Sequence, residues 1–280
     1  LHAVSAYYWR ASYMDESARK KPSAWSTLLP VVLVVLFGVG RVYGAELLSL
    51  LPVKTHAVEV GETTVSDESK ELTYSMRLPV FTTSDPRVQE FLDGLAKTIS
   101  DNASGELANM KQRATEDAAF AKQAGYDLPQ YDYRVDFDVT YNRDNLLSVN
   151  ILQYFYTAGA HGMTILLPHN IDLRDRKPLA LTDLFDDART AQVVLALGVS
   201  ERIEADPDKY FQDALQTASV SLDDQQFYLK EGQIVLHYGL YEIAPYAAGS
   251  SEFEFGVDEV GKELKPAIRR SLERYGAQAQ

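Results

Sequence analysis

The sequence predicts an α+β protein: an antiparallel sheet with helices segregated to one face, preceded by an N-terminal signal peptide or membrane anchor. Two observations predict the fold class. Segments in which apolar and polar residues alternate, as in half-buried strands, occur in both halves of the chain, and segments with helical periodicity lie between them in blocks. Strands do not alternate regularly with helices, which disfavours a doubly wound parallel fold.

Residues 1–44 have the pattern of a signal peptide or membrane anchor. A positive segment, Arg19 to Lys21, precedes an apolar run of thirteen residues, Leu28 to Gly40. Cleavage of a signal would leave a mature chain that begins near Ala45. A retained anchor would attach the protein to the membrane through residues 25–51. Both alternatives predict an exported protein, which is periplasmic, extracellular or membrane-anchored and facing outward.

The exported part of the chain is strongly acidic. After residue 44 it contains 22 Lys and Arg against 38 Asp and Glu, a formal charge of −16. This charge disfavours nucleic acid and anionic polymers as partners and attracts cationic proteins. The alternative is that the acidic surface only keeps the protein soluble. Cysteine is absent, which excludes disulfides, thiolate metal sites and cysteine nucleophiles.

The N-terminal α+β domain, which we place at residues 45–145, begins with two β segments at residues 56–65 and 72–81. A long amphipathic helix follows, capped by Asp85 and ending near Gly125. A helix with one apolar stripe packs most often on the sheet of its own domain. The residues of the stripe are Val88, Phe91, Leu92, Leu95, Ile99, Ala103, Leu107, Met110 and Ala114.

Residues 133–141 show the clearest strand pattern in the chain. Their alternation places Asp136 and Asp138 together on the solvent face. Two carboxylates so close could share a cation, but no further ligand accompanies them, which favours a solvated face. A turn leads into a strand at residues 147–156 that is apolar on both faces. We therefore expect this strand in the middle of the sheet.

The C-terminal α+β module, which we place at residues 146–280, returns to strands after two helical segments. The longer helix, at about residues 188–205, is expected to turn Val193, Val194, Leu197 and Ile203 inward. We expect His169 to share a strand face with Ile165, Leu167 and Ile171, as a core or rim residue and not as a metal ligand.

Two loops hold the candidate binding residues. In the first, a run of aromatic residues breaks into small residues around a single histidine, which suits a tight turn or close approach by a partner. In the second, tyrosines and a proline supply rigid contact area and a Gly-Ser-Ser sequence supplies adaptable backbone. The candidates are Gly159, His161 and Gly162 in the first loop and Tyr241, Glu242, Pro245, Tyr246 and Gly249 in the second.

We expect the two loops to lie side by side at one end of the sheet, because each interrupts a β run and concentrates glycine with aromatics. The alternative is that the tyrosines only hold the second loop against its own sheet. Catalysis by His161 would need an orienting carboxylate, for which Asp172 and Glu242 are the candidates. No nucleophile elbow, phosphate loop, zincin helix, dinucleotide fingerprint or EF-hand loop occurs. We assign no catalytic residue, metal ligand or cofactor.

The same loops, with two strands near them, resemble a known bacterial family. This family is the extracytoplasmic module shared by the lysozyme-sensing anti-sigma factor of the sigma-V system and by a peptidoglycan deacetylase. Residues 72–145 resemble the smaller domain that accompanies the module. The strings that carry the resemblance are 159–162, 170–173, 179–185, 227–229 and 241–249.

The resemblance implies an envelope-facing binding module. We expect neither sigma-factor binding nor deacetylation to carry over, because too few residues precede the apolar run and no deacetylase domain follows residue 280. The leading hypothesis is a non-catalytic module that binds a cationic protein of the lysozyme type, another wall-active protein or a peptidoglycan-associated glycan. The alternatives are a wall-modifying hydrolase or deacetylase-associated enzyme centred on His161, and a purely structural partner of an envelope protein.

Overall fold

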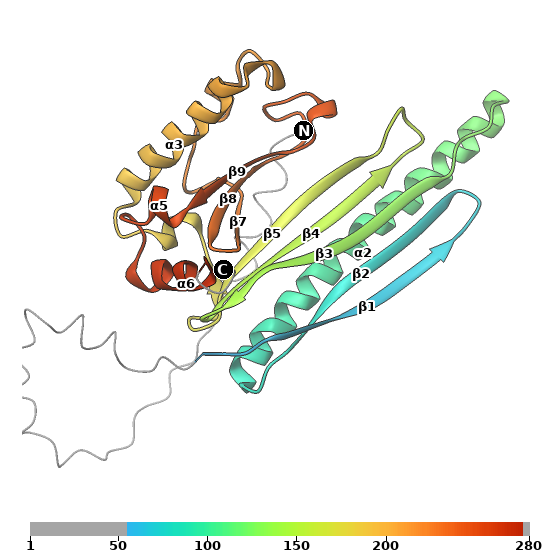
Figure 1. Ribbon diagram of the computed structural model, residues 1–280. Helices are drawn as coiled ribbons and strands as arrows, with labels where there is room; N and C mark the ends of the chain where they lie inside the picture. Colours follow the sequence, from blue (N-terminus) through green and yellow to red (C-terminus); the bar gives the residue numbers. More distant parts are fainter. Residues whose placement is uncertain (1–54, 277–280) are drawn as a thin grey trace, which may run out of the picture. The chain divides into compact units, whose positions relative to one another are not determined.

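The computed structural model describes residues 55–276. The signal peptide or anchor at residues 1–44, the attachment segment at residues 25–51 and the mature start near Ala45 lie outside the described residues. Within the described part, no helix combines the length and the apolar character that a membrane crossing requires. The α+β class is confirmed, since the described chain combines two sheets with several helices (Figure 1).

Six strands form the first sheet, and they lie in sequence order. All neighbouring pairs are antiparallel except β2 with β3, which run parallel. The expectation of a purely antiparallel sheet is therefore wrong at this pair. A helix that crosses over between two strands returns the chain to the end where it started, so the strands become parallel. The strands are β1 Glu59–Glu68, β2 Leu72–Thr82, β3 Tyr131–Arg143, β4 Leu146–Tyr156, β5 Met163–Asp172 and β6 Lys177–Pro178.

The crossover helix is α2, Pro86–Ala124, which covers one face of this sheet (Figure 1). The Asp85 carboxylate caps it by accepting hydrogen bonds from the backbone N–H groups of Arg87 and Val88. Gly125 ends it with φ of 79°, a left-handed conformation that glycine adopts without strain. Both ends agree with the prediction. The buried stripe is Val88, Leu92, Leu95, Ile99, Ala103, Leu107, Met110, Ala114 and Ala121.

Three antiparallel strands form the second sheet: β7 Phe227–Lys230, β8 Gln233–Tyr238 and β9 Ser251–Gly256. Apolar residues of these strands form one core with the helices of this half of the chain. The helices that contribute buried residues to this core are η1 Leu181–Leu184, α3 Ala188–Ala205, α4 Ala214–Thr217, α5 Val257–Val260 and α6 Pro266–Gly276. The short helices η2 Pro207–Lys209 and η3 Tyr246–Ala248 have no buried residue.

Helix α3 buries a face that agrees only in part with the predicted one. Ile203 is buried and Val194 is partly buried against the core, as predicted. Val193 and Leu197, which were expected inward, are 54% and 59% exposed. The helix is apolar on more than one side, so periodicity alone does not choose the buried side. Gly198 allows the observed side to pack on β9, because a Cβ at this position would lie 2.5 Å from the ring of Phe255. The buried residues are Ala191, Leu195, Val199 and Ile203, of which only Ile203 was predicted.

Two buried polar side chains of the first sheet hold strand β7. Asn170 Nδ2 donates to the carbonyl of Phe227 at 2.7 Å, and Ser148 Oγ accepts from the backbone N–H of Leu229 at 3.2 Å. Ser148 alternates along β4 with residues of the α2 core, so β7 packs on the face away from α2. The predicted boundary between residues 145 and 146 falls in the β3–β4 turn, so the first sheet includes strands from both predicted domains.

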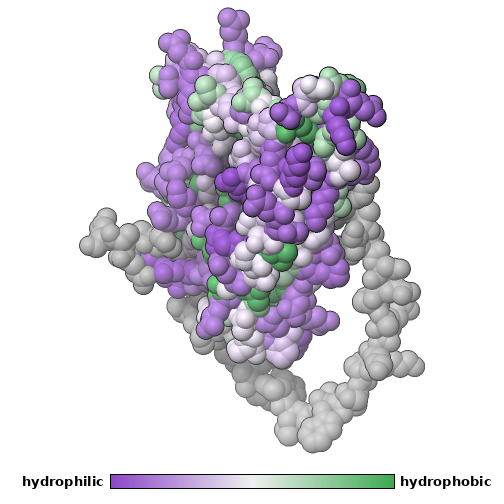
Figure 2. Space-filling model, turned by 90° about the vertical axis from the view of Figure 1, so that its right-hand side faces the viewer, coloured by the Kyte–Doolittle hydropathy of each residue, from purple (hydrophilic) through white to green (hydrophobic). Residues whose placement is uncertain are grey.

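The face of the molecule in Figure 2 is mostly hydrophilic, and apolar side chains on it form small separate areas. Large apolar patches are the usual sign of a hydrophobic interface. This face therefore offers mainly polar groups for contact.

Candidate functional site

The first candidate loop is the turn between β4 and β5. Ala158 in this turn has φ of 58°, a left-handed conformation that is uncommon for residues with a side chain. Gly162 at its end is buried, and a Cβ there would lie 2.3 Å from the ring of Tyr154. The close approach expected at a glycine of this loop is therefore made by an aromatic ring of the protein itself.

The second candidate loop joins β8 to β9 and opens with a tight turn. The N–H of Glu242 donates to the carbonyl of Gly239 at 3.2 Å, and the N–H of Gly239 donates to Glu242 Oε2 at 2.7 Å. Within the turn, Tyr241 has φ of 63°, again left-handed. Pro245 then begins η3, and Gly249 follows it with φ of 75°. The Glu242 carboxylate thus holds the turn that displays Tyr241.

Aromatic contacts join the two loops. The rings of His161 and Tyr246 stack with centroids 3.8 Å apart and 20° between their planes. The Tyr246 hydroxyl donates to the carbonyl of Gly162 at 2.8 Å. The Tyr241 hydroxyl lies 3.3 Å from His161 Nε2. The prediction that the loops lie side by side is confirmed, and the tyrosines attach the second loop to the β4–β5 turn instead of to its own sheet.

The ring nitrogens of His161 both have partners in the loops. Its Nδ1 lies 3.0 Å from the carbonyl of Gly162, which only accepts, so Nδ1 carries a proton and donates. Nε2 faces the Tyr241 hydroxyl of the second loop. His161 therefore links the two loops through Nε2 and through the stacking of its ring on Tyr246.

Neither carboxylate that was considered as an orienting partner bonds to His161. Glu242 Oε2 accepts from Gly239, as described above. Asp172 caps the turn after β5 by accepting from the N–H of Arg174 at 2.9 Å. It lies at the other end of this ten-residue strand, roughly 30 Å from the β4–β5 turn. The arrangement needed for base catalysis by His161 is not formed by these residues.

The described residues also offer no metal centre. Within the range 55–276, no group of three or more His, Asp or Glu side chains could hold a metal ion. Asp136 of the acidic pair on β3 forms an ion pair with Arg77. His169 lies on β5, where burial lowers its pKa to about 4 and keeps the imidazole neutral.

The candidate residues differ in their exposure. Tyr241 is 51% exposed, so much of its ring faces solvent. The joined loops therefore present an aromatic and polar surface around an internal contact. The exposed members are Gly159, His161, Tyr241, Glu242 and Pro245; Tyr246 and Gly249 are partly buried, and Gly162 is buried.

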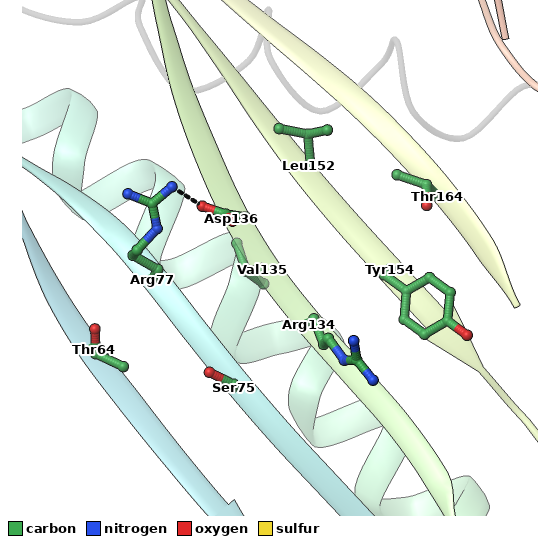
Figure 3. A pocket seen from close by; sticks show the side chains of 9 residues that line it. All are labelled: Thr64, Ser75, Arg77, Arg134, Val135, Asp136, Leu152, Tyr154 and Thr164. Atoms are coloured by element: carbon green, nitrogen blue, oxygen red, sulfur yellow. Dashed lines mark ion pairs between the residues drawn. The ribbon is translucent and has the colours of Figure 1, made fainter.

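Sequence reasoning missed a second site, a pocket of about 460 Å³ on the first sheet (Figure 3). Its side chains lie on the side of the sheet away from α2, which passes behind the strands in Figure 3, except that of Val135, which is buried in the core with α2. The alternation in β3 did place Arg134 and Asp136 on the solvent face, but only the register of five strands brings the other residues to them. The lining residues are Thr64, Ser75, Arg77, Arg134, Val135, Asp136, Leu152, Tyr154 and Thr164.

Comparison with known proteins bears on both sites. Two family models match this chain. The model described as Deacetylase PdaC matches residues 65–164, which include most of the pocket and the first loop. The model described as Protein of unknown function (DUF3298) matches residues 182–258, which include the second loop. The resemblance to a module of a peptidoglycan deacetylase is therefore confirmed.

One curated protein and two solved structures are similar to this chain. The peptidoglycan-N-acetylmuramic acid deacetylase PdaC of Bacillus subtilis (strain 168) is 22% identical over 184 residues, which are 65% of this chain and 36% of that protein. The chain thus spans about a third of the length of this curated relative. A crystal structure of a DUF3298 family member from Bacteroides fragilis has 20% identity and a TM-score of 0.60, covering 79% of this chain and 100% of that one. A crystal structure of a DUF3298 family protein from Pseudomonas aeruginosa has 20% identity and a TM-score of 0.48, covering 77% of this chain and 97% of that one.

Proposed function

We propose that this chain is a non-catalytic binding module of the bacterial cell envelope, and that the exposed surface of the two joined loops binds its partner. Tyr241 carries the proposal. It is half-exposed, and it is held in a left-handed conformation that costs a residue with a side chain about 1–2 kcal/mol. Strain of this kind persists only where the surroundings impose it, and it concentrates at functional sites. A rigid, exposed tyrosine is a typical anchor of a binding surface.

The hydrogen bonds of His161 support binding over catalysis. Nδ1 bonds to Gly162 of its own loop, Nε2 bonds to Tyr241 of the second loop, and neither carboxylate candidate orients the ring. A general base needs a nitrogen free to take a proton from the substrate. The ring instead fixes the shape of the surface that Tyr241 displays.

The envelope setting is supported by similarity to the Bacillus subtilis deacetylase, whose name states a peptidoglycan substrate. The proposal takes from this relative the location at peptidoglycan and not the reaction, because the chain matches only part of that protein. Export through residues 1–44 belongs to the same proposal.

The partner that the charge favours is a cationic wall-active protein of the lysozyme type. After residue 44 the formal charge is −16, and the visible surface in Figure 2 is mostly hydrophilic. Opposite net charge raises association rates by roughly 10-fold to 1000-fold at low salt. Salt removes most of this advantage, since the Debye length falls to about 3 Å near 1 M. Affinity at high salt would then depend on the loop aromatics.

Binding kinetics of lysozyme to the full chain test the proposal. Tyr241→Ala should raise the dissociation rate by roughly 10-fold or more, as for a central anchor, and leave association nearly unchanged. The matched control is Tyr126→Ala, because Tyr126 is 50% exposed and Tyr241 is 51% exposed. Added salt should slow association of both variants equally. Equal dissociation rates for the two variants, or no binding at low salt by folded protein, would contradict the proposal.

The enzyme alternative predicts a different result. His161→Ala should then abolish turnover of peptidoglycan by a protein that remains folded. Release of product from peptidoglycan by the wild type, and its loss in this variant, would replace the binding proposal with catalysis.

A further inference from the structure

The pocket on the first sheet has the size of a ligand site and a polar lining. Its volume of about 460 Å³ lies within the range of roughly 300–1,000 Å³ typical of small-molecule sites. Hydroxyl groups come from Thr64, Ser75 and Thr164, which lie on three different strands. The ring of Tyr154 lies beside Thr164, and Ser75 and Thr64 lie beyond Arg134 (Figure 3). The sheet therefore presents hydrogen-bonding groups around one aromatic surface.

The arginines of the pocket already have carboxylate partners. Arg77 donates to Glu62 at 2.9 Å and pairs with Asp136, as the dashed line in Figure 3 shows. The hydrogen bond to Glu62 is the main cause that raises the pKa of Arg77, so this guanidinium stays charged. Arg134 Nε donates to Asp132 at 3.1 Å. These two cations and three carboxylates carry a formal charge of −1, so an anionic ligand would have to displace an existing partner.

Paired arginines still offer oriented groups to an uncharged ligand. A guanidinium has five N–H donors in a fixed plane, and a carboxylate has about four acceptor positions, so each pair keeps unused donors and acceptors. The Arg134 guanidinium lies over the Tyr154 ring at 5.4 Å from its centre, which fixes both groups. Gly162 lies so close to the same ring that a Cβ would be 2.3 Å from it. The ring is thus supported on one side by Gly162.

We propose that this pocket binds a pyranose unit of an uncharged glycan. A pyranose carries hydroxyl groups around its edge, which match the serine, threonine, arginine and aspartate groups of the pocket. Its faces expose C–H groups, which pack on the part of the Tyr154 ring that Gly162 and the Arg134 guanidinium leave uncovered. Acidic polymers are excluded by the carboxylates, in agreement with the acidic charge of the exported chain. The proposal rests on the pocket alone and does not require that the two loops bind a protein.

Titration of the full chain with neutral oligosaccharides tests the proposal. The probes are tetra-N-acetyl-chitotetraose and cellotetraose, which are both uncharged and separate an amino-sugar source from a plain glucan. We expect saturable binding of at least one of them, with shifts of amide resonances on β2 to β5. Because no net charge is exchanged, affinity should change less than about twofold between low and high salt. Muramyl dipeptide, which carries one carboxylate, should bind more weakly than the better neutral probe.

Variants separate this site from the loop site. Tyr154→Ala should weaken saccharide binding by about tenfold, and Tyr154→Phe should retain most of it because the ring remains. Tyr241→Ala and the exposed control Tyr126→Ala should leave saccharide affinity unchanged. Thermal melting of each variant confirms that it is folded. The proposal fails if folded wild type binds neither neutral probe at millimolar concentration, if Tyr154→Ala and Tyr126→Ala bind equally well, or if the anionic probe binds more tightly.

Discussion

Replacing His161 and Tyr246 by alanine, singly and together, measures how strongly the two loops are joined. Their stacked rings, 3.8 Å apart, should contribute about 0.5–1.5 kcal/mol beyond burial. The hydrogen bond from Tyr246 to Gly162 contributes a further amount of about 0.5–1.5 kcal/mol. Tyr246→Ala alone should therefore lower the free energy of unfolding by about 1–3 kcal/mol. The hydrogen bond of Tyr246 is lost whether or not residue 161 is changed, so the coupling energy contains the stacking together with the effect of sharing the Gly162 carbonyl.

The measurement is urea unfolding of the wild type, both single variants and the double variant. We expect a coupling energy of about 0.5–1.5 kcal/mol. A parallel cycle of His161→Ala with Tyr126→Ala serves as the control, because the ring of Tyr126 contacts Phe120 of α2. Independent sites add within about 0.5 kcal/mol. Coupling no larger for Tyr246 than for Tyr126 would refute the stacking argument and the view that these rings join the loops.

Three further predictions concern stability. Gly198→Ala should lower the free energy of unfolding by about 1–3 kcal/mol, because the added Cβ would lie 2.5 Å from the ring of Phe255. Chemical denaturation measures this loss. A variant as stable as the wild type would show that α3 moves away from Phe255 without cost. Asp85→Ala removes the cap of α2 and should cost about 0.5–2 kcal/mol, whereas Asp85→Asn, which can still accept a hydrogen bond, should cost less. His169 has its pKa lowered from 6.5 to about 4, so the unfolded chain binds its proton first and stability should fall as pH decreases through this range. His169→Gln should flatten that part of the pH profile, and an unchanged difference between the two proteins from pH 7 to pH 4 would exclude His169 as the cause.

Local sequence signals made helix α2 and the contact between the two candidate loops predictable. Asp85 marks the start of the helix, the apolar stripe identifies its buried face, and Gly125 marks its end. These signals can be recognised without knowledge of the rest of the fold. The two loops were predicted to lie side by side because each interrupts a β run and combines glycine with aromatic residues. Their contact could be expected, but the stacking of His161 on Tyr246 depends on how the two sheets pack and is not encoded locally.

Two features required tertiary information. The sequences of β2 and β3 do not show whether the strands pair in parallel or antiparallel, because the alternation of apolar and polar residues is the same in both cases. The buried side of α3 was only partly predicted because its sequence is apolar on more than one side, and contact of Gly198 with Phe255 selects between them. The pocket is formed by residues from Thr64 to Thr164, which only strand register places together.

Gly162 also has a consequence for how the two sites communicate. Its carbonyl accepts from Tyr246 and His161 of the loop site, while its missing side chain makes room for Tyr154 of the pocket. A ligand that tilts Tyr154 and a partner that pulls on Tyr246 therefore act on the same backbone unit. Linkage is reciprocal: the factor by which a bound saccharide changes affinity for the partner must equal the factor by which the partner changes affinity for the saccharide. If both proposed sites bind their ligands, Gly162 is the backbone unit through which occupancy of one would affect affinity at the other.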